Sequence, residues 1–196
     1  MRFTSPFLYY STSRIIASES IKSKPCPLCH KKGYIKSHGK LIGVHHSLPT
    51  PAFRGLRFFC SNRYSNAGCG RTFSVLFSSM VSKSTVRAKH LTELFNNLLC
   101  TGNLHKAWSI SKIPFSVRSA YRWLKLFKIN QSHLRSQLYE QYKNGSPLQL
   151  SHLPTIIQSL SILKHIYPKD SNYIEKYQQQ FQSPIFYQFS SQFIYF

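Results

Sequence analysis

Acidic residues are scarce in this sequence, and their scarcity limits the chemistry that the chain can perform. Aspartate and glutamate together number 5 among 196 residues, against 26 lysines and arginines. A nuclease or strand-transferase that works through two metal ions needs several carboxylates gathered around them. The acids here are scattered along the chain, at Glu19, Glu93, Glu140, Asp170 and Glu175. We therefore expect no catalytic carboxylate set and no enzymatic activity of the chain alone.

Long hydrophobic runs are missing as well. No stretch reaches the roughly 18 uninterrupted apolar residues of a membrane-spanning helix, so we expect none. Residues 1–24 are rich in serine and contain a single acid, a composition faintly similar to that of a transit peptide, and the apolar run Phe7 to Tyr10 is too short for a secretory signal. We interpret residues 1–24 as a flexible leader. The expected location is the cytoplasm, at the nucleoid if the source is bacterial.

The excess of positive charge predicts a polyanionic partner. The formal net charge is +21 at pH 7. A surface of this kind attracts phosphate backbones regardless of their sequence, which favours nucleic acid, and an acidic membrane surface is the competing polyanion. Hydrophobic residues make up 42% of the chain and aromatic residues 15%. Most of the chain is therefore expected to fold.

Four of the five cysteines fall in one segment, residues 25–80, and predict a metal site. The first pair has the C-x2-C spacing with which one tight turn presents two thiolates to a tetrahedral ion, whereas eight residues separate the second pair. His30 and His38 are alternative ligands if one cysteine of the second pair does not bind. An odd cysteine count fits a reducing compartment better than a disulfide framework. The predicted ligands of this structural Zn²⁺ are Cys26, Cys29, Cys60 and Cys69.

The glycines and short β-type runs of residues 25–80, such as Leu56 to Phe59, predict a small β-rich module. From Ser82 the spacing of apolar residues becomes helical, and residues 82–145 are predicted to form a helical domain. Residues 147–196 are predicted to be a helical and aromatic extension. The fold class is therefore α+β. The predicted helices begin at Ser84, Asn103, Ser116 and Gln131 in the helical domain, with weaker candidates at Leu153–Tyr167 and Ser171–Phe181.

The segment Leu104 to Phe127 has the dimensions of a helix-turn-helix, in which the second helix enters the major groove of DNA. Arginine can donate two hydrogen bonds to a guanine edge, and serine permits close approach. The residues predicted to contact nucleic acid from this helix are Ser116, Arg118, Ser119, Arg122 and Lys125. Those predicted to contact phosphates from the cysteine-rich module include Arg57, Arg63 and Arg71. An ordinary helical bundle with a solvated charged side is the alternative interpretation, and Cys100 is predicted to be a core thiol of the first helix.

The cysteine-rich module resembles the zinc ribbon at the N-terminus of many bacterial insertion-sequence transposases. The similar segments are Cys26-Pro-Leu-Cys29, Tyr34 to Lys40, Leu56 to Cys60 and, most specifically, Gly68-Cys69-Gly70-Arg71-Thr72-Phe73-Ser74. The resemblance covers about residues 25–130. It implies that the four cysteines bind zinc and that the ribbon, with the helices after it, holds or recognises double-stranded DNA. The acidic catalytic domain of such transposases has no counterpart in this sequence.

The favoured hypothesis is a zinc-dependent DNA-binding protein related to transposases and without catalysis of its own. An RNA-binding zinc protein is an alternative, because aromatic residues near the cysteines, such as Tyr34, Phe58 and Tyr64, could stack on unpaired bases. A transposase or nuclease component that acts with a partner is another. The aromatic tail, Phe186 to Phe196, could also join a partner subunit or a membrane surface.

Overall fold

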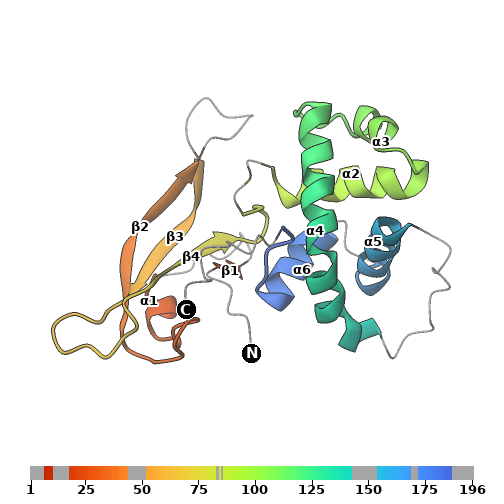
Figure 1. Cartoon of the computed structure of the whole chain (residues 1–196). Helices are drawn as coiled ribbons and strands as arrows, with labels where there is room; N and C mark the ends of the chain where they lie inside the picture. The colour runs from red at the N-terminus through yellow and green to blue at the C-terminus, as the bar shows by residue number, and fades with distance from the viewer. Residues whose placement is uncertain are drawn as a thin grey trace, which may run out of the picture. The chain divides into compact units, whose positions relative to one another are not determined.

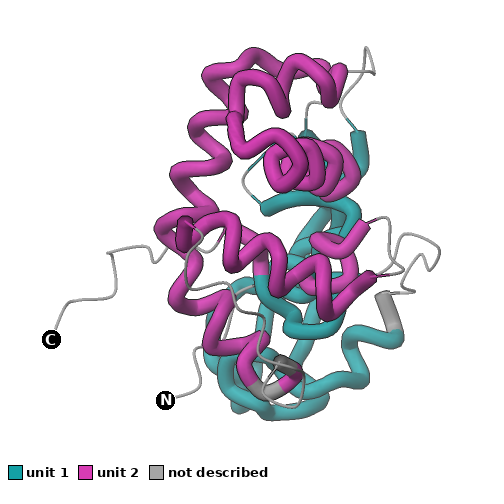
Figure 2. Tube along the Cα trace, turned by 90° about the vertical axis from the view of Figure 1, so that its right-hand side faces the viewer, with its two compact units in different colours: residues 1–87, 178–183 teal, residues 88–177, 184–196 magenta. Residues whose placement is uncertain are grey.

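A computed structural model describes residues 7–10, 18–43, 52–82, 84, 86–142, 154–168 and 172–186 (Figure 1). It has an α+β fold, as the sequence predicts, with one sheet and a set of helices. The chain divides into two compact units, coloured separately in Figure 2. The first comprises Met1–Arg87 with Gln178–Ser183, and the second comprises Ala88–Tyr177 with Pro184–Phe196.

The sheet of the first unit has the strand order β1-β4-β3-β2. Its long hairpin consists of β2 (Ile35–Gly43) and β3 (Ala52–Cys60), which run antiparallel, and β4 (Thr72–Phe77) pairs antiparallel with β3. The edge strand β1 (Phe7–Tyr10) pairs parallel with β4. Residues 50–55 contain a proline and a glycine, which favours an exposed loop. The strand β3 already begins at Ala52, so that expectation is wrong for Ala52 to Gly55.

The residues of β3 alternate between the two faces of the sheet. Phe58 and Cys60 are fully buried on one face, whereas Arg57 on the opposite face is exposed. Phe58 stacks on Phe73 of β4, with ring centroids 5.7 Å apart. Burial of an aromatic side chain of this size contributes about 1.5–3 kcal/mol. The cluster that forms the core of this unit consists of Ile21, Cys26, Ile35, Phe58, Cys60, Phe73 and Val75.

The prediction that residues 1–24 form a flexible leader is wrong for the described part of that segment, which contains a strand and a helix. Besides β1, a short helix α1 covers Ser18–Lys22, and Tyr9 and Ile21 are buried. The backbone of Tyr9 is held on its free edge by the side chain of Gln182, which accepts from the Tyr9 amide at 2.8 Å and donates to the Tyr9 carbonyl at 2.8 Å. The buried aromatic ring and the paired backbone keep this strand in the sheet.

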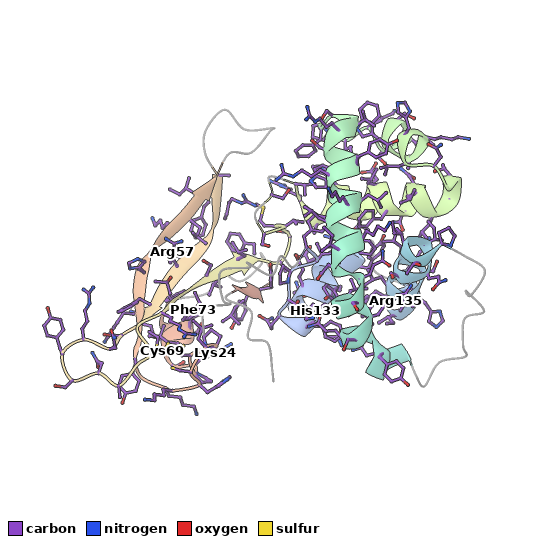
Figure 3. All side chains as sticks on the ribbon, in the orientation of Figure 1. Lys24, Arg57, Cys69, Phe73, His133 and Arg135 are labelled. Carbon is purple, nitrogen blue, oxygen red and sulfur yellow. The ribbon has the colours of Figure 1, made fainter. Side chains whose placement is uncertain are left out.

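The second unit is helical. Its helices are α2 (Ala88–Thr101), α3 (Leu104–Ser111), α4 (Val117–Tyr142), α5 (Thr155–Ile166) and α6 (Tyr173–Phe181), whose last residues belong to the first unit. Phe95 of α2 packs against Phe127 of α4, with ring centroids 5.0 Å apart. Arg135, labelled in Figure 3, joins α4 to α5 by donating to the Ser159 hydroxyl and the Thr155 carbonyl, each at 2.8 Å. Among the described residues, no helix is long and apolar enough to cross a membrane.

The sequence predicted two helices, from Ser116 to Phe127 and from Gln131 to Tyr142, where the structure has the single helix α4. The intervening residues include Asn130, a weak helix former, but no proline or glycine. Asn130 is buried, and its side-chain amide donates to the carbonyl of Ile185 at 2.8 Å. This tertiary hydrogen bond satisfies a polar side chain in the middle of a helix, so α4 continues through the predicted break.

Candidate metal centre

The sulfur atoms of the four predicted cysteine ligands form one cluster. All four lie within 4.8 Å of one another. The Sγ atoms of Cys26 and Cys69 are 3.9 Å apart, and those of Cys29 and Cys60 are 3.7 Å apart. A tetrahedral ion with metal–sulfur bonds of about 2.3 Å, the length found for zinc, requires sulfur–sulfur distances of about 3.8 Å. The cluster therefore fits a metal ion held by four thiolates.

Two turns present these cysteines, and the first has the expected short form. Cys26 and Cys29 lie in the turn between α1 and β2. The amide of His30 donates to the carbonyl of Cys26 at 2.8 Å, and the amide of Leu28 points at the Cys26 sulfur at 3.4 Å. His30 closes the turn with a positive φ of 61°. An amide directed at a sulfur stabilises its thiolate form, so the Leu28 amide favours the thiolate of Cys26, the form that binds a metal ion.

The second turn is closed by an equivalent backbone hydrogen bond in spite of its longer spacing. Cys60 ends β3, and Cys69 precedes β4. The amide of Gly70 donates to the carbonyl of Cys60 at 2.9 Å, and Gly70 has a φ of 70°, like His30 in the first turn. The amide of Cys69 points at the Cys60 sulfur at 3.4 Å. Both cysteine pairs thus end in a left-handed residue whose amide returns to the first cysteine.

One backbone hydrogen bond closes the second turn and leaves its extra residues in a separate loop. The amide of Gly68 donates to the carbonyl of Ser61 at 2.9 Å. Ser61 and Gly68 therefore take the two middle places of a C-x2-C turn, and Asn62–Ala67 form a loop outside it. Figure 1 shows this loop, between β3 and β4, extending away from the sheet. Gly68 is required here, because a Cβ atom would lie 2.1 Å from the Ser61 carbonyl oxygen and 2.8 Å from the Cys60 sulfur.

The pKa values of the Cys26, Cys29 and Cys60 thiols are shifted in different directions. Burial raises the pKa of Cys60 to about 12, and burial also raises the pKa of Cys26. For Cys29, burial acts in the same direction, but hydrogen bonds from the Lys31 backbone and from neighbouring thiols outweigh it and lower the pKa to about 7. Without an ion, the buried pair thus keeps its protons at neutral pH. Metal binding has to release them, and this couples metal affinity to pH.

Neither histidine that the sequence offered as an alternative ligand belongs to the cluster. The group of four contains only cysteines, and His30 and His38 are exposed.

The fifth cysteine, Cys100, was predicted to be a core thiol, and that prediction is wrong. Cys100 is exposed on α2, because the buried face of this helix is formed by residues such as Leu91, Leu94 and Leu98, and Cys100 lies on another side.

The residues predicted to bind nucleic acid lie in both units. Arg57 lies on β3 (Figure 3), and Arg63 and Arg71 lie in the segment between β3 and β4. The other five lie at the start of α4 or just before it. Ser119 is half-buried, and the remaining members of the set are exposed: Arg57, Arg63, Arg71, Ser116, Arg118, Arg122 and Lys125.

The segment between α3 and α4 is a short turn held by local contacts. Asn103 caps α3, as predicted, by accepting from the Lys106 amide at 3.0 Å. Lys112 ends α3 in the left-handed conformation, with φ 46°. The indole of Trp108 donates to the carbonyl of Phe115 at 2.7 Å, and the ring of Phe115 packs edge-on against Trp123, 5.0 Å away. These contacts fix the turn to both helices.

Sequence reasoning missed the exposed apolar side chains of α4 and the grouping of aromatic and basic side chains on the sheet. Tyr121 and Ile129 of α4 have exposed fractions of 54% and 64%, beside the basic residues of the same helix. On the sheet, His38 approaches Phe59, with ring centroids 6.2 Å apart, and the Arg63 guanidinium lies 5.8 Å from the same ring. The grouping on the sheet depends on the register of β2 against β3, which places Lys36 opposite Phe59 and which the sequence does not give.

Comparisons of the chain with protein-family models, with curated protein sequences and with solved structures found no match. The cysteine cluster and the distribution of charge over the described residues are therefore the features that bear on function. They define a protein with a candidate metal centre in one unit and an exposed basic helix in the other.

Proposed function

We propose that the protein is a zinc-dependent DNA-binding protein, related to insertion-sequence transposases and without a catalytic domain of its own. The ion of the cysteine cluster is Zn²⁺, and it has a structural role. Four thiolates at tetrahedral spacing leave no ligand position for water, as in structural zinc sites. Full burial of Cys26 and Cys60 supports the same role.

The observation that carries the DNA-binding proposal is the exposed basic face of α4. Arg118, Arg122 and Lys125 are exposed and are spaced by four and three residues, so they lie on one side of the helix. The opposite side packs into the unit through Ala120, Trp123 and Phe127. The helix can therefore enter a major groove with its basic side while its apolar side stays packed on α2 and α3.

The sheet of the first unit supplies a second basic surface. Lys36, Arg57 and Arg63 are exposed, and both Arg63 and His38 lie close to the aromatic ring of Phe59. Lysine and arginine side chains on such a surface contact phosphates, which positions a protein on DNA without reading its sequence. The net charge of +21 supports binding dominated by phosphate contacts.

The two surfaces have different expected roles, and substitution separates them. We expect Arg122→Ala to reduce the difference in affinity between a selected site and unrelated duplexes by about 1–3 kcal/mol, because a base contact is lost. We expect Arg57→Ala to weaken binding to all duplexes alike and to lower the slope of log affinity against log salt by about 1. Fluorescence anisotropy with a site selected from random DNA measures both.

Lys164→Ala is the control, since it removes one exposed positive charge from α5, outside both surfaces. It should leave the preference between sites unchanged. If Arg122→Ala and Arg57→Ala lose affinity uniformly, α4 is not the recognition helix. If the wild-type protein binds single-stranded RNA more tightly than duplex DNA at matched salt, the RNA-binding alternative replaces the proposal.

A further inference from the structure

The loop Asn62–Ala67, here named the finger, presents an aromatic side chain to solvent. Tyr64 at its tip is 95% exposed, the highest value among the described exposed large hydrophobic side chains. A tyrosine normally buries most of its ring, because its area contributes strongly to folding. The ring of Tyr64 contributes almost nothing to the fold in this position, so it is available to a ligand.

The backbone of the finger is held in an unfavourable conformation at its tip. Tyr64 and Ser65 have φ angles of 51° and 66°. The left-handed region is unfavourable for a residue with a side chain, and it is especially uncommon for bulky residues. Glycine or asparagine would adopt these angles at a lower cost. Two successive left-handed residues turn the chain sharply, and the amide of Asn66 donates to the carbonyl of Arg63 at 3.1 Å across this turn.

Hydrogen bonds at the base hold the finger in this shape. The side-chain amide of Asn66 donates to the carbonyl of Arg63 at 2.7 Å and to the Ser61 hydroxyl at 3.3 Å. The ammonium group of Lys31 donates to the carbonyl of Ala67 at 2.8 Å. Both ends of the finger adjoin the turn that presents two of the cysteine ligands. The aromatic ring thus stands on a fixed support, which lowers the entropic cost of binding through it.

The surroundings of the finger are positively charged. Arg63 lies at its base against the ring of Phe59, and Lys31 and Lys32 are exposed on the neighbouring turn. A protein that binds single-stranded nucleic acid combines such charges with an aromatic ring on which a base stacks. In an intact duplex the grooves present only base edges. The face of a base becomes available to a ring only where the stack is interrupted.

We propose that Tyr64 stacks on an unpaired base of DNA and directs the protein to interrupted duplexes, such as bulges or the junctions of duplex with single strand. This inference rests on the proposed DNA-binding function and adds the kind of DNA to it. The phosphates beside the unpaired base meet the lysines and Arg63, and the ring of Tyr64 covers the base. Stacking is tolerant of base identity, so the preference is for DNA structure and not for sequence.

The test uses the full-length, zinc-loaded protein and two duplexes that differ only in one unpaired 2-aminopurine, a fluorescent base whose emission falls when it stacks. We expect the wild-type protein to bind the bulged duplex more tightly and to quench it further. Tyr64→Ser should lose about 5- to 150-fold in this preference. Tyr64→Phe should keep it, because the ring remains. Tyr139→Ser, which removes another exposed tyrosine, on α4, is the control.

Three results overturn the inference: no preference of the wild-type protein for the bulge, a preference that Tyr64→Ser leaves unchanged, or a loss that Tyr139→Ser reproduces. Zinc content is measured for each variant, so that damage to the metal centre is recognised. Failure of the proposed function is a different result, in which the wild-type protein binds neither duplex at low salt. A wild-type protein that binds both duplexes without preferring the bulge contradicts only the role of Tyr64.

Discussion

Replacing Cys26 by serine is expected to abolish tight zinc binding and to unfold the cysteine-rich part of the first unit. Cys26 is fully buried and belongs both to the metal cluster and to the core around Phe58 and Phe73. Structural zinc contributes apparent free energies of about 10–16 kcal/mol in small zinc domains, which exceeds the stability of most folds. The loss of one thiolate should therefore remove metal and tertiary structure together. Metal analysis and the dispersion of amide signals in an NMR spectrum measure the two effects.

Cys100→Ser is the matched control, because it makes the same chemical change at an exposed cysteine outside the cluster. It should keep about one equivalent of zinc and an unchanged spectrum. The account of the metal centre is contradicted if Cys26→Ser retains stoichiometric zinc, or if the protein with the metal removed stays folded over β2, β3 and β4. Loss of zinc from Cys100→Ser would contradict it as well.

Gly68→Ala is expected to damage the same centre, although it changes no ligand. The added methyl group would meet the Ser61 carbonyl oxygen at 2.1 Å, so the backbone hydrogen bond between Ser61 and Gly68 has to open. That hydrogen bond keeps the finger outside the turn and sets the separation of Cys60 from Cys69. We expect zinc affinity to fall at least about 100-fold, the upper end of the effects seen when supporting contacts of a metal site are removed.

Ala67→Ser is the control for this change, since it adds a single atom to the exposed side chain of the adjacent residue. Zinc affinity is measured by competition with a chromophoric chelator at constant pH, because proton release enters the measured affinity. An unchanged affinity of Gly68→Ala would mean that the turn tolerates a wider opening. An equal loss of zinc affinity in Ala67→Ser would show that the finger, and not the hydrogen bond between Ser61 and Gly68, determines zinc affinity.

The parts that could be predicted from the sequence have strong local signals. Apolar residues at helical spacing identified α2, and Asn103 identified the start of α3. The C-x2-C spacing and the Cys69-Gly70 pair identified the ligands, because the geometry of a tetrahedral site limits which thiols can meet. These features depend on few residues that are close in sequence, so no tertiary information is needed.

The parts that could not be predicted depend on contacts between distant residues. The strand β1 exists because it pairs with β4 and because Gln182 holds its free edge. The turn before α4 contains no glycine, and Lys112 takes the left-handed conformation there, which the residue type does not indicate. The sequence also does not show which arginines are exposed. Arg57 is exposed, whereas Arg54 is half-buried and its guanidinium donates to the carbonyl of Val81 at 3.1 Å.

A salt series with a random-sequence fluorescent duplex measures whether the protein binds DNA and whether that binding depends on zinc. Each salt concentration is measured with the zinc-loaded protein, with a chelator present, and after zinc is restored. We expect tight binding at low salt, a steep linear fall of log affinity with log salt, loss of most binding on chelation and recovery with zinc. Absence of binding at low salt, or binding that chelation leaves unchanged, would contradict the proposed function.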